Sequence, residues 1–159
     1  MTTELSPIAL ALGRVPTGLY VVTSEAAGKP LGFVGSFLMQ VGFRPPTLSV
    51  AVAQGREHLG AMRAHGRFAV SVLDGASARR MGAFFKKYPP GETPFDHVAC
   101  GATPGGLTVL SDALAWLECR VSGEHATGDH VVLFGVVEHA ALLREGEPSV
   151  HLRRDGLGY

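Results

Sequence analysis

The chain has 159 residues, of which 46% are hydrophobic and 18% are charged. This length suits one well-buried domain and is too short for two ordinary ones, so we expect a single domain over residues 1–159. Lysine plus arginine and aspartate plus glutamate both number 14. The balanced charge argues against a nucleic acid or another polyanion as partner.

No segment reaches the roughly 18 consecutive apolar residues that a membrane-spanning helix needs, and the first residues lack the pattern of a secretory signal. We therefore expect a cytoplasmic protein without a membrane partner. The cysteines Cys100 and Cys119 are too few and too far apart for a disulfide framework, so both are expected to be reduced. The mean hydropathy of +0.20 is high for a small monomer and favours a homodimer.

The first third of the chain predicts a short helix and a β-hairpin. Ser6 and Pro7 are typical of a helix start, and Gly13 closes that helix. Residues Gly18–Thr23 are rich in β-branched and aromatic side chains, and turn-forming residues follow them. We expect this strand to pair with a second strand over Leu31–Phe37.

The stretch from Lys29 to Val52 carries features that a plain core hairpin does not need. Gly32 and Gly35 lie inside the second strand, directly before Ser36. Glycine within a strand often marks a bulge or a place where a ligand approaches the backbone closely. The residues alone favour the bulge.

The chain is expected to turn through Gln40 and Gly42 and to form a further strand over Thr47–Ala53. Residues Glu57–His65 have the apolar spacing of a short amphipathic helix. The alternating segment Arg67–Leu73 then predicts a strand.

A third helix is expected to begin with Ser77 as its cap. Its apolar residues share one face, and lysines occupy its last turn, where the helix dipole favours positive charge. The apolar face of this helix carries Met81, Phe84 and Phe85, and the lysines are Lys86 and Lys87.

The long Pro- and Gly-rich segment Tyr88–Gly106 favours a lid or a surface loop.

Two strands are expected in the last third of the chain. Leu114–Val121 alternates, with apolar side chains on one face and Trp116, Glu118 and Arg120 on the other, so we expect a half-exposed strand. Val131–Val137 is apolar on both faces, which suits a strand between a barrel core and a partner subunit.

These segments amount to six or seven strands and about three short helices, without sustained β-α-β alternation. We therefore predict a mainly β fold, an antiparallel Greek-key barrel with peripheral helices. No G-x-G-x-x-G follows a strand, which argues against a Rossmann site. His97 and Cys100 form an isolated H-x-x-C without a second pair of ligands, so no metal site is predicted.

Four stretches in order along the chain carry a family resemblance. They are Leu12–Ser24, Gly32–Pro46, the triplet 128–130 before a long apolar strand, and the tail Val150–Tyr159. Together they resemble the flavin reductase family of FMN-binding split barrels, and the tail is similar to the end of the flavin reductase domain of cyanobacterial flavodiiron proteins. The resemblance implies a homodimeric split barrel with FMN in a groove at the subunit interface, reduced by NADH or NADPH.

The resemblance also implies roles for individual residues. His130 matches the family histidine near the nicotinamide and is the candidate catalytic residue. Other positions match the segment that lines the flavin and its ribityl-phosphate, the strand end that runs along the cofactor, and a helix end near the phosphate. These candidate cofactor-binding residues are Val34, Gly35, Ser36, Phe37, Gln40, Ala53, Gln54, Gly55, Arg56, Phe85 and Lys86.

Relatives carry hydroxyl side chains where this chain has Phe33, Gly35 and Gly42, so the phosphate is expected to depend on backbone N–H groups and on Arg56. Arg56 fits an anionic ligand and a solvated surface arginine equally well. Lys86 is well explained as a charge at a helix C-terminus. Without the family context, a histidine such as His130 is more often a turn residue bonded to a neighbour.

The sequence thus predicts an NAD(P)H-dependent flavin reductase that transfers a hydride from nicotinamide to flavin N5, with a monooxygenase or another electron acceptor as partner. The chain lacks a strong acid/base pair or nucleophile triad, as expected where the cofactor carries the reactive step. An alternative is a non-enzymatic FMN electron carrier of the flavoredoxin kind. A third interpretation is a barrel that has lost its flavin and binds a small ligand or a partner.

Overall fold

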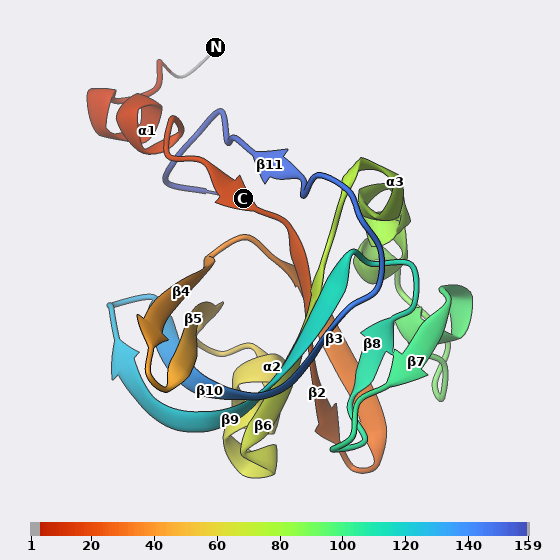
Figure 1. Cartoon of the computed structure of the whole chain (residues 1–159). Helices are drawn as coiled ribbons and strands as arrows, with labels where there is room; N and C mark the ends of the chain where they lie inside the picture. The colour runs from red at the N-terminus through yellow and green to blue at the C-terminus, as the bar shows by residue number, and fades with distance from the viewer. Residues whose placement is uncertain (1–3, 159) are drawn as a thin grey trace.

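A curled antiparallel sheet forms the body of the structure, a computed structural model that describes residues 4–158 (Figure 1). Its seven strands run in the order β3-β2-β6-β9-β10-β5-β4, and each neighbouring pair is antiparallel. The predicted mainly β, antiparallel fold class is confirmed. The strands are β2 (Tyr20–Ala26), β3 (Lys29–Gly35), β4 (Leu38–Phe43), β5 (Pro46–Ala53), β6 (Arg67–Val72), β9 (Ala115–Ala126) and β10 (His130–Leu142).

An arm made from both ends of the described chain projects from this body (Figure 1). It contains α1 (Pro7–Leu12) and the paired short strands β1 (Thr17–Gly18) and β11 (Val150–His151). The Ser6 side chain caps α1 by accepting a hydrogen bond from the backbone N–H of Ala9 at 3.2 Å. The predicted first helix is therefore confirmed, and the tail lies beside it.

The hairpin of β2 and β3 has an unbroken register. Ala27 and Gly28 form its two-residue turn with φ values of 51° and 75°, as a type I′ turn requires. The pairing then runs without a shift past Gly32 to Gly35. The bulge interpretation of these two glycines is therefore wrong.

Leu38–Phe43 forms strand β4, so the expected turn through Gln40 and Gly42 is wrong. The strand pairs with β5, and its register shifts between Gln40 and Gly42 so that Val41 bulges out. Met39, Val41 and Phe43 alternate with Gln40 and Gly42, but all three are exposed, so the alternation does not mark a buried face.

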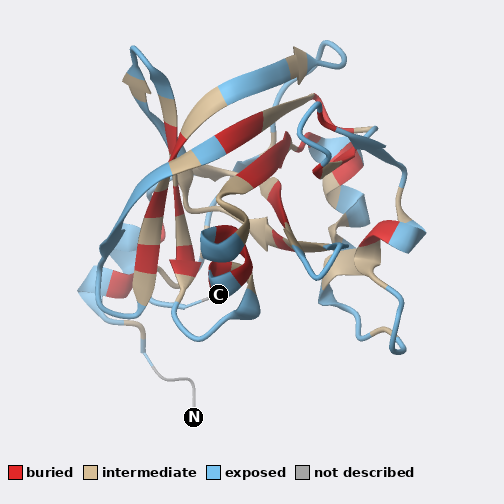
Figure 2. Ribbon diagram, turned by 90° about the horizontal axis from the view of Figure 1, so that it is seen from below, coloured by how far each residue is buried: buried red, intermediate tan, exposed pale blue. Residues whose placement is uncertain are grey.

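Helix α2 (Glu57–His65) has the predicted bounds and closes one side of the core. Gly66 ends it in the left-handed conformation with φ 75°. Leu59 and Met62 are buried in the core cluster that α2 shares with the sheet. Figure 2 shows buried residues concentrated in the strands and on parts of the helices, with exposed residues in the connections. Other buried members of the core against which α2 packs are Val22, Val50, Val52, Phe68, Val70 and Leu133.

No helix within residues 4–158 has the length and apolar character needed to cross a bilayer.

The third predicted helix differs from the expectation. Asp74 rather than Ser77 is its cap, and a single α-helical turn, α3 (Gly75–Ala78), passes into the 3-10 helix η1 (Arg79–Phe85). Phe85 is 73% exposed, so it does not share a buried face with Met81 and Phe84. Lys86 and Lys87 follow the helix end instead of lying in its last turn.

The segment predicted as a long loop contains regular structure. A 3-10 helix, η2 (Pro94–His97), precedes strand β7 (Cys100–Ala102), which pairs with β8 (Thr108–Leu110). Strand β9, which we expected to be half exposed, also differs in part, because Glu118 is fully buried while Arg120 is exposed.

Candidate functional site

A mostly apolar groove of about 380 Å³ lies where the end of β3 meets the end of β5, the start of α2, η1 and the tail. Strand ends, a helix start and a tail meet there because the sheet stays open between its edge strands β3 and β4. The lining residues are Leu19, Gly32, Phe33, Val34, Gly35, Ser36, Phe37, Ala51, Val52, Ala53, Arg56, His58, Met81, Phe84, Phe85, His151 and Arg153.

Most of the predicted cofactor-binding residues meet in this groove, although they come from three separate parts of the chain. The exit of β3, the end of β5 and the end of η1 each supply part of the lining. The predicted residues that line it are Val34, Gly35, Ser36, Phe37, Ala53, Arg56 and Phe85.

Ser36 and Phe37 lie between strands, where β3 has ended and β4 has not begun. The Phe37 carbonyl oxygen accepts a hydrogen bond from the backbone N–H of Ala51 at 2.9 Å, which fixes the crossing. The Ser36 hydroxyl makes no hydrogen bond within residues 4–158 and lies in the groove lining. A ligand in the groove therefore meets an open hydroxyl beside an aromatic ring.

Gly32 accommodates an aromatic ring of the protein itself. A Cβ at this position would lie 2.5 Å from Cζ of Phe95. The Phe95 ring packs edge-on against Phe84, with centroids 5.2 Å apart, and Phe84 lines the groove. The missing side chain thus lets an internal aromatic pair support the groove wall.

The other candidates do not line the groove. Gln40 lies on exposed β4, where its amide donates to the Gly42 carbonyl at 3.1 Å. Gln54 donates from its side chain to the Gly128 carbonyl at 2.6 Å, joining the turn after β5 to the turn before β10. Gly55 occupies the first of these turns with φ 80°, and Lys86 is exposed and extended after η1.

His130 stands next to the groove and outside its lining. Its Nδ1 is 2.9 Å from Oδ1 of Asp129, and this hydrogen bond holds the pKa of the Asp129 carboxyl below its usual value. The His130 ring meets Phe37 edge-on, with centroids 5.8 Å apart. His130 therefore contacts a groove-lining residue without lining the groove itself.

His58 is a lining residue that sequence reasoning missed. Its Nε2 lies 3.1 Å from the carbonyl oxygen of Gly32, and its ring packs edge-on against Phe33. Nδ1 is buried and has no hydrogen-bond partner within the described residues. Burial lowers the pKa of His58, which keeps the ring neutral with its proton on Nε2.

His151 and Arg153 of the tail also line the groove and were not predicted. The guanidinium carbon of Arg153 lies 4.5 Å from the centroid of the Phe37 ring. Their contribution depends on the pairing of β1 with β11, which joins residues more than a hundred positions apart, so no local pattern could reveal it.

The family model described as "Flavin reductase like domain" matches residues 12–156. The chain belongs to the flavin reductase-like domain family. The predicted family resemblance is thereby confirmed.

Curated flavin reductase-like relatives fall into two groups. Diflavin flavoprotein A 1 of Synechocystis sp. PCC 6803 is 32% identical over 156 residues, which cover 97% of this chain and 27% of that protein. A protein named "Probable flavin reductase" from Rhizobium meliloti strain 1021 is 37% identical over 141 residues, covering 86% of this chain and 44% of that protein. The chain thus spans about a quarter of the length of the diflavin flavoproteins that it matches.

Solved flavin reductases share the fold of this flavin reductase-like chain. The NADH:FAD oxidoreductase SgcE6 of Streptomyces globisporus C-1027 superposes with a TM-score of 0.83 at 26% identity, covering 96% of this chain and 94% of that one. The styrene monooxygenase flavin reductase of Pseudomonas putida S12 gives 0.79 at 25% identity, covering 94% of both chains. The predicted split-barrel class is confirmed.

The donor set of the groove in this flavin reductase-like domain fits a flavin nucleotide. Phe84, Phe85 and Val34 offer apolar surface for a flat ring, and Ser36 offers a hydroxyl that nothing else occupies. Arg56 adds a cation at the mouth, beside the start of α2, where backbone N–H groups also favour an anion. Such a flavin would supply the redox-active ring, while the chain would supply the slot, the hydroxyl and the cation.

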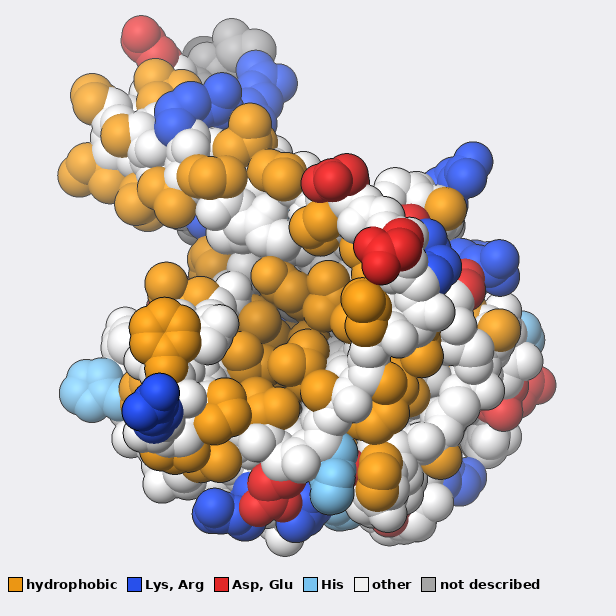
Figure 3. Space-filling model, in the orientation of Figure 1, with side chains coloured by type: hydrophobic (Ala, Val, Ile, Leu, Met, Phe, Trp, Pro, Cys, Tyr) orange, Lys and Arg blue, Asp and Glu red, His pale blue; other side chains and the backbone are white. Residues whose placement is uncertain are grey.

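A second hollow lies below the arm of this flavin reductase-like domain, and hydrophobic side chains gather in it (Figure 3). It is lined by Val15 and Pro16 before β1 and by residues of several strands, among them Met39 of β4 and Val150 of β11. Ser36 and Phe37 line both hollows, so the Phe37 side chain forms a shared wall.

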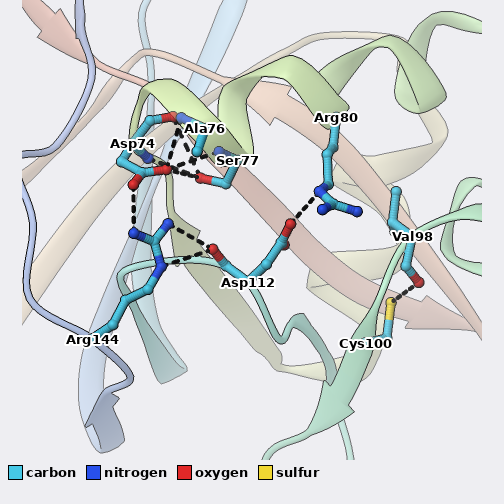
Figure 4. Close-up of polar contacts among 8 residues, drawn as sticks. All are labelled: Asp74, Ala76, Ser77, Arg80, Val98, Cys100, Asp112 and Arg144. Atoms are coloured by element: carbon cyan, nitrogen blue, oxygen red, sulfur yellow. Dashed lines mark hydrogen bonds and ion pairs between the residues drawn. The ribbon is translucent and has the colours of Figure 1, made fainter.

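Figure 4 shows a polar cluster at the start of α3. None of its charged residues lines either hollow. Arg144 pairs with the Asp74 carboxylate at 2.6 Å and donates to the Asp112 carbonyl at 2.9 Å. Its guanidinium holds the pKa of the Asp74 carboxyl well below the usual range. Arg80 pairs with the Asp112 carboxylate. The cluster therefore joins the segment after β10 to the start of α3 and to the turn between β8 and β9. This segment precedes the tail that enters the groove.

The titratable residues of the described chain offer no metal site, because no group of three or more histidine, cysteine, aspartate or glutamate side chains is arranged to hold an ion within residues 4–158. Cys100 and Cys119 are both free.

Proposed function

We propose that this chain is an NAD(P)H-dependent flavin reductase, that FMN is its flavin, and that residues 1–159 act as one flavin reductase-like domain. The observation that carries the proposal is the groove in which Ser36, Phe37 and Arg56 meet, within a chain that the family model matches over residues 12–156. The reaction is hydride transfer from nicotinamide C4 to flavin N5, and the flavin ring itself supplies that chemistry.

The residues of the chain bind and orient the reactants. Phe84 and Phe85 present apolar surface to one side of the slot, while the backbone around Gly35 and the Ser36 hydroxyl meet the polar edge of the flavin. Arg56 binds the phosphate at the groove mouth. His130 shapes the nicotinamide side, acting next to Phe37. Holding two flat rings at short range accounts for most of the protein's task in such a transfer.

The proposal includes a homodimer with an acceptor protein as electron partner. Support for the dimer comes from apolar side chains that are exposed on the arm, on β4 and at the end of β10, beyond what single scattered residues explain. Support for an acceptor comes from the solved reductase of styrene monooxygenase, whose name states such a role. The exposed apolar side chains that support the dimer are Ile8, Leu10, Leu12, Met39, Val41, Phe43, Leu142 and Leu143.

The use of NAD(P)H would place the reaction in the cytoplasm.

The position of His130 favours a second function, a non-enzymatic FMN electron carrier. The residue assigned to the nicotinamide side does not line the groove and only contacts Phe37, which does. A carrier needs the flavin slot and no nicotinamide site. In that case a partner protein, instead of NADH or NADPH, would reduce the flavin.

Flavin titration and nicotinamide oxidation test these functions on the full chain. FMN and FAD are titrated by quenching of flavin fluorescence, and oxidation of NADH and of NADPH is then followed by absorbance with each flavin. We expect FMN to bind and a nicotinamide to be consumed. FMN binding without consumption of either nicotinamide would favour the carrier, and absence of flavin binding would exclude both functions.

A further inference from the structure

Arg153 enters the groove from the tail and lies over the face of Phe37. Its guanidinium carbon is 4.5 Å from the ring centroid, which is the geometry of a cation–π contact. Arg153 is half-buried, and it comes from a different part of the chain than Arg56, the other arginine of the groove. The groove therefore has two cations on separate segments.

The backbone holds Arg153 in place from both sides. Upstream, His151 pairs with Thr17 in the two-stranded sheet of the arm. Downstream, the backbone N–H of Gly156 donates to the Ala9 carbonyl at 2.9 Å. The position of the guanidinium thus follows from the anchoring of the tail to the N-terminal segment.

Direct contacts with the N-terminal segment also reach Arg153 itself. The guanidinium of Arg14 donates to the Arg153 carbonyl oxygen at 3.2 Å. Gly13 lies so close that a Cβ on it would be 2.5 Å from the same oxygen. The main chain of Arg153 is therefore fitted to its neighbours without any help from its side chain.

The Arg153 guanidinium lies over the Phe37 ring, and its N–H donors remain available for a ligand. The N–H donors of arginine lie in the plane of the group, so an arginine stacked on a ring can still donate to an anion. Within residues 4–158, the Arg153 side chain makes no hydrogen bond and no ion pair. The Ser36 hydroxyl, also without a hydrogen bond there, lies in the same groove.

We propose that the Arg153 guanidinium, preorganised on the Phe37 ring, binds a phosphate group of a nucleotide in the groove. The inference rests on the proposed function, which brings two phosphate-bearing nucleotides to this site, the flavin and the nicotinamide dinucleotide. Arginine binds phosphate through paired N–H donors, and a guanidinium already fixed by stacking loses little freedom on binding. The structural alternative is an arginine that only covers Phe37.

Riboflavin provides the decisive comparison, because it has the ring system of FMN and lacks the phosphate. The dissociation constants of FMN and riboflavin, and the KM values of NADH and NADPH, are measured for the wild type, Arg153→Gln, Arg153→Lys and Arg154→Gln. Arg154 is the exposed neighbour outside the groove lining and serves as the control. Riboflavin binding also reports whether each variant keeps an intact slot.

If the phosphate is that of the flavin, Arg153→Gln weakens FMN by about tenfold and leaves riboflavin within about twofold. If it is that of the nicotinamide dinucleotide, both flavins bind normally and KM for the dinucleotide rises by about tenfold. Arg153→Lys keeps the charge without the paired donors and restores part of the loss. Arg154→Gln behaves as the wild type.

Equal weakening of FMN and riboflavin by Arg153→Gln would show that Arg153 only packs on Phe37, and values all equal to the wild type would show no role in binding. Either result overturns the inference. Failure of the proposed function is distinguishable, because then the wild type itself would bind no flavin and oxidise no nicotinamide, and the inference would fall with it.

Discussion

His58 and Gly32 join the first turn of α2 to strand β3 through a contact of 3.1 Å between ring Nε2 and the carbonyl oxygen. Because Nε2 donates there, the second ring nitrogen carries a lone pair, and it is buried without a hydrogen-bond partner in the described chain. A second proton on this ring would have no acceptor. The groove wall is therefore built on a neutral histidine whose pKa burial lowers.

The lowered pKa of His58 makes the stability of the fold depend on pH. Below the ordinary histidine pKa of about 6.5, the unfolded chain binds a proton that the folded chain does not, so His58 reduces the free energy of unfolding as pH falls. We expect wild type to lose stability between about pH 7.5 and pH 5.5 and His58→Gln to lose less. Urea unfolding across this range measures the difference. Equal losses in both proteins would contradict the prediction, and His139→Gln, at an exposed site on β10, is the control.

The contact of Gly32 with Phe95 predicts the effect of adding one methyl group. Gly32→Ala forces the Phe95 ring, and Phe84 with it, away from the groove wall, which should cost about 1–3 kcal/mol of unfolding free energy and weaken flavin binding. In a Phe95→Leu background, the same change should cost less, because the two residues are coupled. Thermal and urea unfolding of the four proteins measure this coupling. Gly60→Ala, at an open position of α2, should be neutral or stabilising, and equal costs for Gly32→Ala in both backgrounds would refute the steric account.

Local signals explain which parts of the fold could be predicted. The bounds of α2 follow from helical spacing and from Gly66, the left-handed residue that ends it. Strand β4 was missed: Met39 and Phe43 are exposed, so no buried face marks the strand, and its state depends on pairing with β5. The burial of Glu118 was also missed, because its partner Arg67 lies on another strand.

The residues of the candidate site also divide into those that the sequence predicted and those that only tertiary contacts bring to the groove. Ser36 and Phe37 stand in Gly32–Pro46, one of the four stretches that carry the family resemblance, and both line the groove. His58 and Arg153 reach it through tertiary contacts, a carbonyl on β3 for one and the pairing of the arm for the other. Gln40, in contrast, was assigned from its place near the motif, and it points to its own strand neighbour.

The buried Glu118 side chain predicts that replacement by alanine and replacement by glutamine differ in their cost to stability. Its buried carboxylate accepts hydrogen bonds from Arg67 at 3.1 Å and from the backbone N–H of Gly105 at 3.0 Å. Glu118→Ala leaves the Gly105 N–H without a partner and opens a cavity, which should cost about 2–4 kcal/mol of unfolding free energy. Glu118→Gln keeps an acceptor and should cost less. Urea unfolding measures these costs. Glu124→Gln, in an exposed ion pair with Arg63, is the control and should stay within about 0.5 kcal/mol of wild type. Similar unfolding free energies for Glu118→Ala, Glu118→Gln and Glu124→Gln would contradict the prediction.

His130→Ala tests whether the histidine beside Phe37 acts on the nicotinamide. On the reductase proposal, KM for the nicotinamide should rise by about tenfold while the dissociation constant of FMN changes by less than about twofold. Steady-state kinetics and flavin titration measure the two quantities separately. His125→Ala, at an exposed site on β9, is the control. An unchanged KM would leave His130 with the structural role of bonding Asp129 in the turn before β10.

Ser36→Trp tests the location of the flavin slot. Ser36 lies between β3 and β4 and outside every ladder of the sheet, so a larger side chain there can project into the groove without breaking a strand. We expect FMN affinity to fall by about a hundredfold or more, because the indole would fill the space of the flavin ring. The free energy of unfolding should change by less than about 1 kcal/mol. Flavin fluorescence titration and urea unfolding measure the two effects, and Ser122→Trp, on the exposed part of β9, provides the same substitution away from the groove. Normal FMN affinity in folded Ser36→Trp would mean that the flavin binds elsewhere, most directly in the second hollow across Phe37.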